Sequence, residues 1–110
     1  MQTPEYSLPP QNIEAEQSIL SACLLSPASM LEAADLILPS QFYRDSHQII
    51  FNAMLRLAID RKPVDLVMVA DALKNSNKLS EIGGASYLQR VIDVAPMAVN
   101  IAHYCEIVKG

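Results

Sequence analysis

The chain has 110 residues, 51% of them apolar and 5% aromatic, with a formal net charge of −4, so it can bury one domain core without metal ions or disulfides. No apolar run reaches membrane-spanning length, and the N-terminus lacks the basic start and apolar stretch of a signal peptide, which predicts a soluble, cytoplasmic protein. The eight basic residues are scattered and do not form the basic stripe of a nucleic-acid-binding surface.

Residues 1–11 are polar and proline-bearing, and we expect them to form a flexible N-terminal arm. After the arm, apolar residues recur at helical spacing and the breaks between them carry helix-capping residues. Asn12 is expected to cap a helix that ends just before Ser26. Ser26 should cap a second helix with Pro27 at its first position, and this helix should stop before Pro39.

A short turn, "SQFYR", is predicted from Ser40, followed by the long helix "SHQIIFNAMLRLAIDR" with a cap at Asp45 or Ser46. This helix is apolar nearly all round, so we expect it to be central in the fold. Its single polar stripe consists of Gln48, Asn52, Arg56 and Asp60.

The next segment, "VDLVMVADALK", is compatible with a strand because of its β-branched run. A helix is favoured, because Asp65 is a good cap and the apolar residues Leu66, Val69, Ala70 and Leu73 share one helical face. Two further helices are predicted, "ASYLQRVID" with an apolar stripe that includes Tyr87, and a last helix that starts at Pro96. The pattern predicts an all-α fold, a compact bundle of about six helices with short loops.

Two adjacent glycines, Gly83 and Gly84, stand in "LSEIGGASYLQR". A phosphate-binding loop would follow a strand and place a lysine at a fixed offset, and neither condition holds here. We therefore interpret the pair as a turn. Gly83 suits a left-handed helix C-cap, and Gly84 suits the next N-cap or a close approach of two backbones.

One carboxylate of the first helix is out of place. Glu14, Gln17, Ser18 and Ser21 gather on its polar face, whereas Glu16 falls inside the apolar arc. A buried carboxylate needs a partner, and the candidates are His47, which lies in the apolar part of the long helix, Arg44 and Tyr43. Glu16 and His47 would suit a general acid–base pair, but no nucleophile or metal-ligand cluster accompanies them, so we favour a structural polar anchor.

Other candidate residues carry weaker signals. Cys23 and Cys105 belong to no metal-binding spacing and are expected to be buried thiols. Val67 and Met68 lie off the inward face of their helix and form a candidate partner surface. An Asp-Ser pair at a helix start is similar to the phosphopantetheine site of acyl carrier proteins, with Ser46 as the attachment point, although an ordinary N-cap explains it as well.

Five segments, taken in order, closely resemble the N-terminal domain of DnaB-type replicative helicases. They are "PPQNIEAEQSIL", "FYRDSHQIIF", "KPVDLVMVADAL", "LSEIGGASYLQRV" and "APMAVNIAHYCEIV", and they cover nearly everything after residue 9. The family often has a glycine where this chain has "SAC", residues 21–23, a change that a helix tolerates.

The resemblance implies that residues 12–110 form the all-α head of a collar on a hexameric ring. In this family the head is joined through a helical hairpin and linker to a RecA-like ATPase domain, which would hold ATP and Mg²⁺ and contact DNA. The implied partners are other helicase subunits, primase and a helicase loader, with no membrane. This part of the chain is therefore expected to be non-catalytic, with no cofactor of its own. The alternative drawn from the residues is an α-helical nucleic-acid-binding module.

Overall fold

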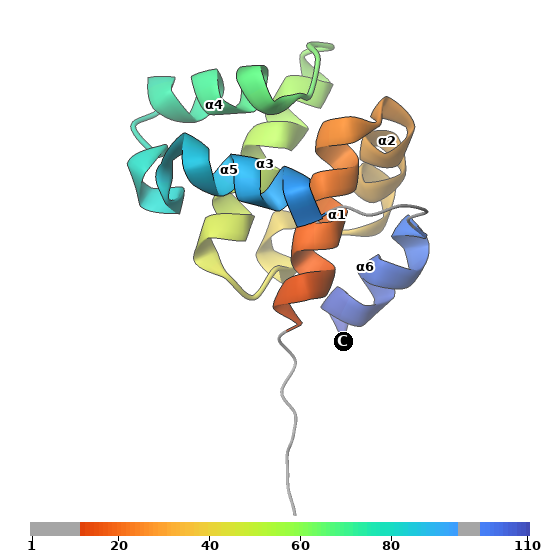
Figure 1. Cartoon of the computed structure of the whole chain (residues 1–110). Coiled ribbons are helices and arrows are strands. Elements are labelled where there is room, and N and C mark those ends of the chain that lie inside the picture. The colour runs from red at the N-terminus through yellow and green to blue at the C-terminus, as the bar shows by residue number, and fades with distance from the viewer. Residues whose placement is uncertain (1–11, 95–99) are drawn as a thin grey trace, which may run out of the picture.

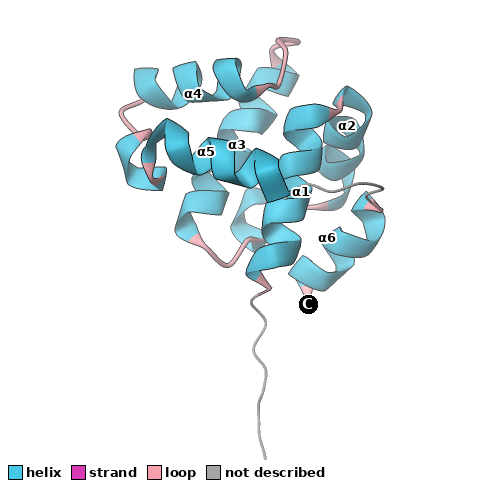
Figure 2. Ribbon diagram, viewed as in Figure 1, coloured by secondary structure: helices cyan, strands magenta, loops and turns pink. Residues whose placement is uncertain are grey.

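The computed structural model describes residues 12–94 and 100–110, so the predicted arm and Pro96 lie outside the described ranges. Within these ranges the chain is helical, without strands (Figures 1 and 2), which confirms the predicted all-α class and the helical interpretation of residues 64–74. The elements are α1 (Ile13–Leu25), α2 (Pro27–Leu36), the 3-10 helix η1 (Pro39–Gln41), α3 (Asp45–Ile59), α4 (Leu66–Asn75), the 3-10 helix η2 (Ser80–Ile82), α5 (Gly84–Val94) and α6 (Ile101–Lys109). None of the helices in the described part of the chain has both the length and the apolar character needed to cross a membrane.

Side-chain caps set the start of four helices. The Asn12 side chain accepts a hydrogen bond from the N–H of Ala15 at 3.0 Å, and the Ser26 hydroxyl accepts one from Ser29 at 3.2 Å. Asp65 caps α4 and Asn100 caps α6 in the same way. The three caps predicted at Asn12, Ser26 and Asp65 are thus confirmed, and each satisfies a backbone donor that the helix itself leaves unpaired.

Two helix boundaries differ from the prediction. Helix α2 ends at Leu36 rather than directly before Pro39. Ile37 is already extended, and its side chain points into the core with 2% of its surface exposed. Helix α3 has Arg44 as its N-cap, without a side-chain hydrogen bond, so neither Asp45 nor Ser46 is the cap. Helix α6 spans Ile101–Lys109 with the extended Asn100 as its cap, and the start predicted at Pro96 lies outside the described residues.

The central helix is α1, not the long helix α3 as the sequence pattern suggested. Helix α1 packs against α2, α3, α5 and α6, and Figure 1 shows it crossed by α5. Ser18 and Ser21, which were expected on a solvent-facing side, are buried, and the Ser21 hydroxyl donates to the carbonyl of Ile92 at 3.1 Å. Small serine side chains let neighbouring helices approach α1 closely, so a polar face became an interhelical contact.

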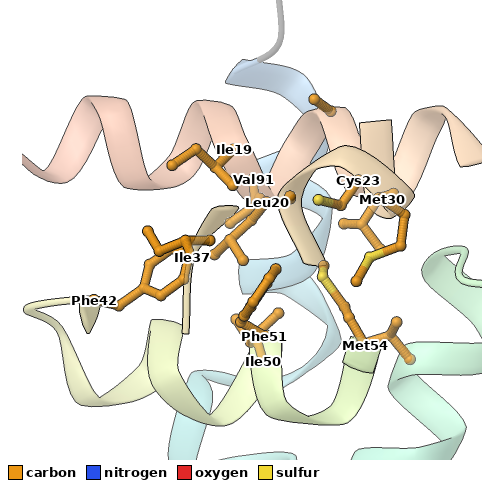
Figure 3. Close-up of a cluster of buried hydrophobic side chains, with 14 of the residues drawn as sticks. Ile19, Leu20, Cys23, Met30, Ile37, Phe42, Ile50, Phe51, Met54 and Val91 are labelled. Atoms are coloured by element: carbon orange, nitrogen blue, oxygen red, sulfur yellow. The ribbon is translucent and has the colours of Figure 1, made fainter. Parts of the chain in front are cut away.

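The core lies between α1 and α3 and is closed by residues from the other helices (Figure 3). The residues labelled there are Ile19, Leu20, Cys23, Met30, Ile37, Phe42, Ile50, Phe51, Met54 and Val91. The rings of Phe42 and Phe51 pack with their centroids 5.1 Å apart. Each large apolar side chain that is fully buried contributes about 1.5–3 kcal/mol, and this cluster fixes α3 against α1.

Candidate functional site

Glu16 lies near the start of α1 with only 1% of its surface exposed. Its Oε2 accepts a hydrogen bond from the backbone N–H of Tyr43 at 2.6 Å, and its Oε1 accepts one from the backbone N–H of Arg44 at 3.4 Å. The same Oε1 lies 2.6 Å from Nδ1 of His47. All three candidate partners therefore contact Glu16, two of them through the backbone. Three donors offset the cost of removing the charged carboxylate from water.

His47 is fully buried and links Glu16 to a residue of α5. Since a carboxylate only accepts, Nδ1–H of His47 donates to Glu16, and Nε2 then accepts the O–H of Tyr87 at 2.6 Å. The Tyr87 oxygen in turn accepts from Gln17 Nε2 at 3.1 Å and from Arg44 Nη1 at 3.3 Å. The rings of His47 and Tyr87 stack with centroids 5.9 Å apart.

These five residues, Glu16, Gln17, Arg44, His47 and Tyr87, form what we call the Glu16 network. It ties together α1, the segment before α3, α3 itself and α5. A carboxylate, an imidazole and a hydroxyl in this order also occur in acid–base relays. Here, however, the hydroxyl belongs to a tyrosine that is held by Gln17 and Arg44, so its partners position it rather than free it to react. These contacts fit the predicted structural polar anchor.

Two members of the network were missed by sequence reasoning. Tyr87 was placed only on an apolar stripe, and Gln17 was assigned to the polar face of the first helix. A usable signal did exist for Tyr87, because a tyrosine on an inward-facing stripe needs a partner for its hydroxyl. Nothing in the local pattern distinguished Gln17 from its polar neighbours.

Gly83 and Gly84 hold the turn that brings Tyr87 to the network. Both have positive φ values, 105° at Gly83 and 78° at Gly84, which side chains with a Cβ rarely adopt. A Cβ on Gly83 would lie 3.0 Å from the Cβ of Tyr87, whereas one on Gly84 would meet open space. Gly83 ends the 3-10 helix η2, and Gly84 is the first residue of α5.

A shallow hollow lies over the outer edge of the network. Its lining includes Tyr43, Arg44, Ser46, Gly83 and Tyr87. Tyr43 is 60% exposed, while its backbone is anchored on Glu16. Ser46 is half-buried in the first turn of α3. Tyr43 and Arg44 thus lie at the hollow on a backbone that hydrogen bonds to Glu16 hold in place.

The two residues of the candidate partner surface on α4, Val67 and Met68, differ in their exposure. Val67 is 74% exposed on α4. Met68 is half-buried and packs against the core. It directly precedes Val69, which is fully buried. The candidate partner surface on this helix is therefore smaller than the sequence suggested.

Both cysteines are free and buried. Burial raises the pKa of the Cys23 thiol to about 12, and the neighbouring Cys105 adds to the rise. Burial likewise raises the pKa of the Cys105 thiol to about 11, although Lys109 lowers it in part. Since the thiolate is the reactive form, both cysteines serve as core side chains at neutral pH. No cluster of three metal-ligating side chains occurs among the described residues.

Comparison with known proteins gives consistent matches over the chain. The family model for the DnaB-like helicase N terminal domain matches residues 8–110. The replicative DNA helicase DnaB of Geobacillus stearothermophilus and the replicative DNA helicase DnaC of Bacillus subtilis are each 49% identical over 102 residues. These matches cover 93% of this chain but only 22% of either relative, so the chain spans about a fifth of their length.

Solved structures agree with this match. The N-terminal domain of DnaB helicase from Mycobacterium tuberculosis superposes with a TM-score of 0.87 at 39% identity, covering 93% of this chain and 71% of that one. The corresponding domain from Helicobacter pylori, described together with its interactions with primase, gives a TM-score of 0.73 at 23% identity, covers 87% of this chain and 74% of that one, and so supports the fold. The chain belongs to the DnaB-like helicase N-terminal domain family.

Proposed function

We propose that this domain is a non-catalytic assembly and docking module of a hexameric replicative DNA helicase in the cytoplasm. The observation that carries the proposal is the alignment of 93% of the chain with 22% of replicative helicases that are 49% identical to it. The remaining length of such a parent would contain the ATPase domain, with its ATP and Mg²⁺, and the DNA contacts. The family assignment also favours this role over the acyl-carrier hypothesis for Ser46.

Primase is the partner that we assign to the domain, along with the other helicase subunits and a helicase loader. The Helicobacter pylori relative has been described with its interactions with primase, which supports the assignment. Tyrosine and arginine are enriched at the energetic centres of protein interfaces. Tyr43 and Arg44 are exposed here on a backbone that Glu16 holds in place, so little conformational entropy would be lost on docking. We therefore place the primase contact at the hollow above the network.

The experiment is a titration of this chain with the C-terminal domain of a primase from a close relative, followed by calorimetry. We expect weak binding, because an isolated domain lacks the avidity of a ring. Tyr43→Ala and Arg44→Ala should each weaken the complex by about 1–2 kcal/mol. Val67→Ala is the control, since it removes an apolar side chain that is also exposed, 74% against 60% for Tyr43, but lies on α4. Loss of binding in the control alone would move the primase contact to α4.

Two further measurements test the non-catalytic role. The chain should sediment as a monomer or weak dimer at micromolar concentration and should not hydrolyse nucleotide above a heat-denatured control. Binding of single-stranded DNA should be weak, because a net charge of −4 opposes contact with phosphates. Micromolar DNA affinity with a steep salt dependence would favour the nucleic-acid-binding alternative instead.

A further inference from the structure

A second hollow lies between α3 and α4 and has a volume of about 780 Å³. Its floor is apolar and is made by Ile49, Ala53, Leu57, Ala72 and Leu73. Its rim is polar and is made by Ser40, Gln48, Asn52, Arg56, Asp60, Lys62, Ser76 and Lys78. We call it the α3–α4 groove, and it shares no residue with the Glu16 network.

The rim of the groove contains the polar stripe that the sequence showed on the long helix. Its charged members are the cations Arg56, Lys62 and Lys78 and the anion Asp60. Three of the eight basic residues of a chain with net charge −4 thus gather at one groove. Concentrated positive charge beside an apolar floor is complementary to a negatively charged partner that also carries apolar side chains.

These rim groups are available to a partner. Of the three cations, Lys78 alone forms an ion pair among the described residues, with Glu81 at 3.9 Å on the surface, where such a pair contributes little. Asn52 is exposed, and Gln48 uses only its Nε2, which donates to the carbonyl of Phe42 at 2.7 Å. Amide side chains in this position can pair with the N–H and C=O groups of an extended backbone.

The dimensions suit a short extended segment. The stripe from Gln48 to Asp60 follows α3 for about 18 Å, which corresponds to about five residues of extended chain. Single-stranded nucleic acid fits less well, because binding of its bases relies on aromatic stacking and none of the residues that line the groove is aromatic. We propose that the α3–α4 groove binds an extended acidic peptide of a partner protein, with its carboxylates on Arg56 and Lys78 and its apolar side chains on the floor.

The test uses a fluorescein-labelled peptide of about eight residues in which Asp and Glu alternate with Leu and Val. Its binding to this chain is followed by fluorescence polarisation at low and at moderate salt. Arg56→Glu combined with Lys78→Glu removes the positive rim. Arg90→Glu combined with Lys109→Glu is the matched control, because both side chains are exposed outside the groove and the net charge changes equally.

We expect the groove variant to weaken binding by about tenfold or more and the control by less than about twofold. Replacement of the carboxylates of the peptide by amides should abolish binding. In a nuclear magnetic resonance titration, the amides of Asn52 and Ser76 should shift while that of Tyr87 stays unchanged. If the charge-reversed variant does not fold, Arg56→Gln with Lys78→Gln replaces it, with Arg90→Gln and Lys109→Gln as control.

Several outcomes would overturn the proposal. Equal weakening in both double variants would mean that overall charge, not the groove, attracts the peptide. Tighter binding of a thymidine oligonucleotide that the groove variant abolishes would make the groove a nucleic-acid site. Self-association of the chain that disappears in the groove variant would identify a second copy as the occupant. No saturable peptide binding at low salt would also refute it.

Discussion

Two regions of this domain contain polar side chains of the same helix, α3, but these side chains are buried in one region and exposed in the other. At its N-terminal end, His47 is fully buried, and both of its ring nitrogens have partners at 2.6 Å. Farther along, Asn52, Arg56 and Asp60 are exposed on the rim of an open groove. Buried polar groups are retained when every donor and acceptor is satisfied, and exposed ones keep their binding capacity for water or a partner.

The difference separates structural roles from binding roles. A change in the Glu16 network should alter stability because it leaves a buried group without a partner. A change on the polar rim of the α3–α4 groove should leave stability nearly intact and alter only what binds there. Substitutions in the Glu16 network, in the Gly83 turn and on the groove rim test whether structural and binding roles are separate. Each is compared with a second substitution, at an exposed position, at a neighbouring position or in the other region.

The largest effect is expected for Glu16→Ala, which should lower the free energy of unfolding by about 3 kcal/mol. The substitution removes the acceptor of His47 Nδ1–H and of the backbone N–H of Tyr43. Urea denaturation followed by circular dichroism measures it. Glu14→Ala is the control, because Glu14 is exposed on the same turn of α1. Equal effects of the two substitutions would remove the special role of the network.

Gly83→Ala should lower stability by about 2 kcal/mol, because alanine is strained at a φ of 105° and its Cβ would press on Tyr87 at 3.0 Å. Gly84→Ala has a positive φ but open space around it, so its cost should be smaller. Thermal denaturation of both variants compares strain plus contact with strain alone. A Gly83 variant as stable as the wild type would show that the turn is not required to place Tyr87.

Tyr87→Phe should lower stability by about 1 kcal/mol. It removes the hydroxyl between His47 and Arg44 but keeps the ring that stacks on the imidazole. The ¹⁵N chemical shifts of the His47 ring nitrogens should change at Nε2 and stay nearly constant at Nδ1. Tyr43→Phe serves as the comparison, since that side chain is 60% exposed. Unchanged shifts at Nε2 would contradict the assigned hydrogen bond.

The smallest effect is expected in the groove. Asn52→Ala and Arg56→Ala should each change the free energy of unfolding by no more than about 0.5 kcal/mol in the same urea titration. Both side chains are exposed on the solvent side of α3, and alanine is a good helix former there. A loss of stability at Arg56 comparable to that at Glu16 would show that the groove is part of the structural framework, and the comparison between the two regions would fail.

Much of the fold was accessible from local pattern. Apolar spacing and the caps at Asn12, Ser26 and Asp65 defined three helix starts, and each rests on contacts within a few residues. The position of Glu16 on an apolar arc led to His47, Arg44 and Tyr43 as candidate partners, all of which contact it. Because a buried charge must be satisfied, a carboxylate on the apolar face of a helix indicates by its position alone that partners lie nearby.

The sequence by itself determined the helical class, the caps and the need for a partner at Glu16, because these depend on neighbours along the chain or on a general cost of burial. Tertiary structure alone decided that α1 is central, that Ser21 is buried against Ile92 and that Tyr87 completes the network. Tyr87 lies 40 positions from His47 in the chain. Such contacts depend on how helices pack in space, and helical periodicity describes only one helix at a time.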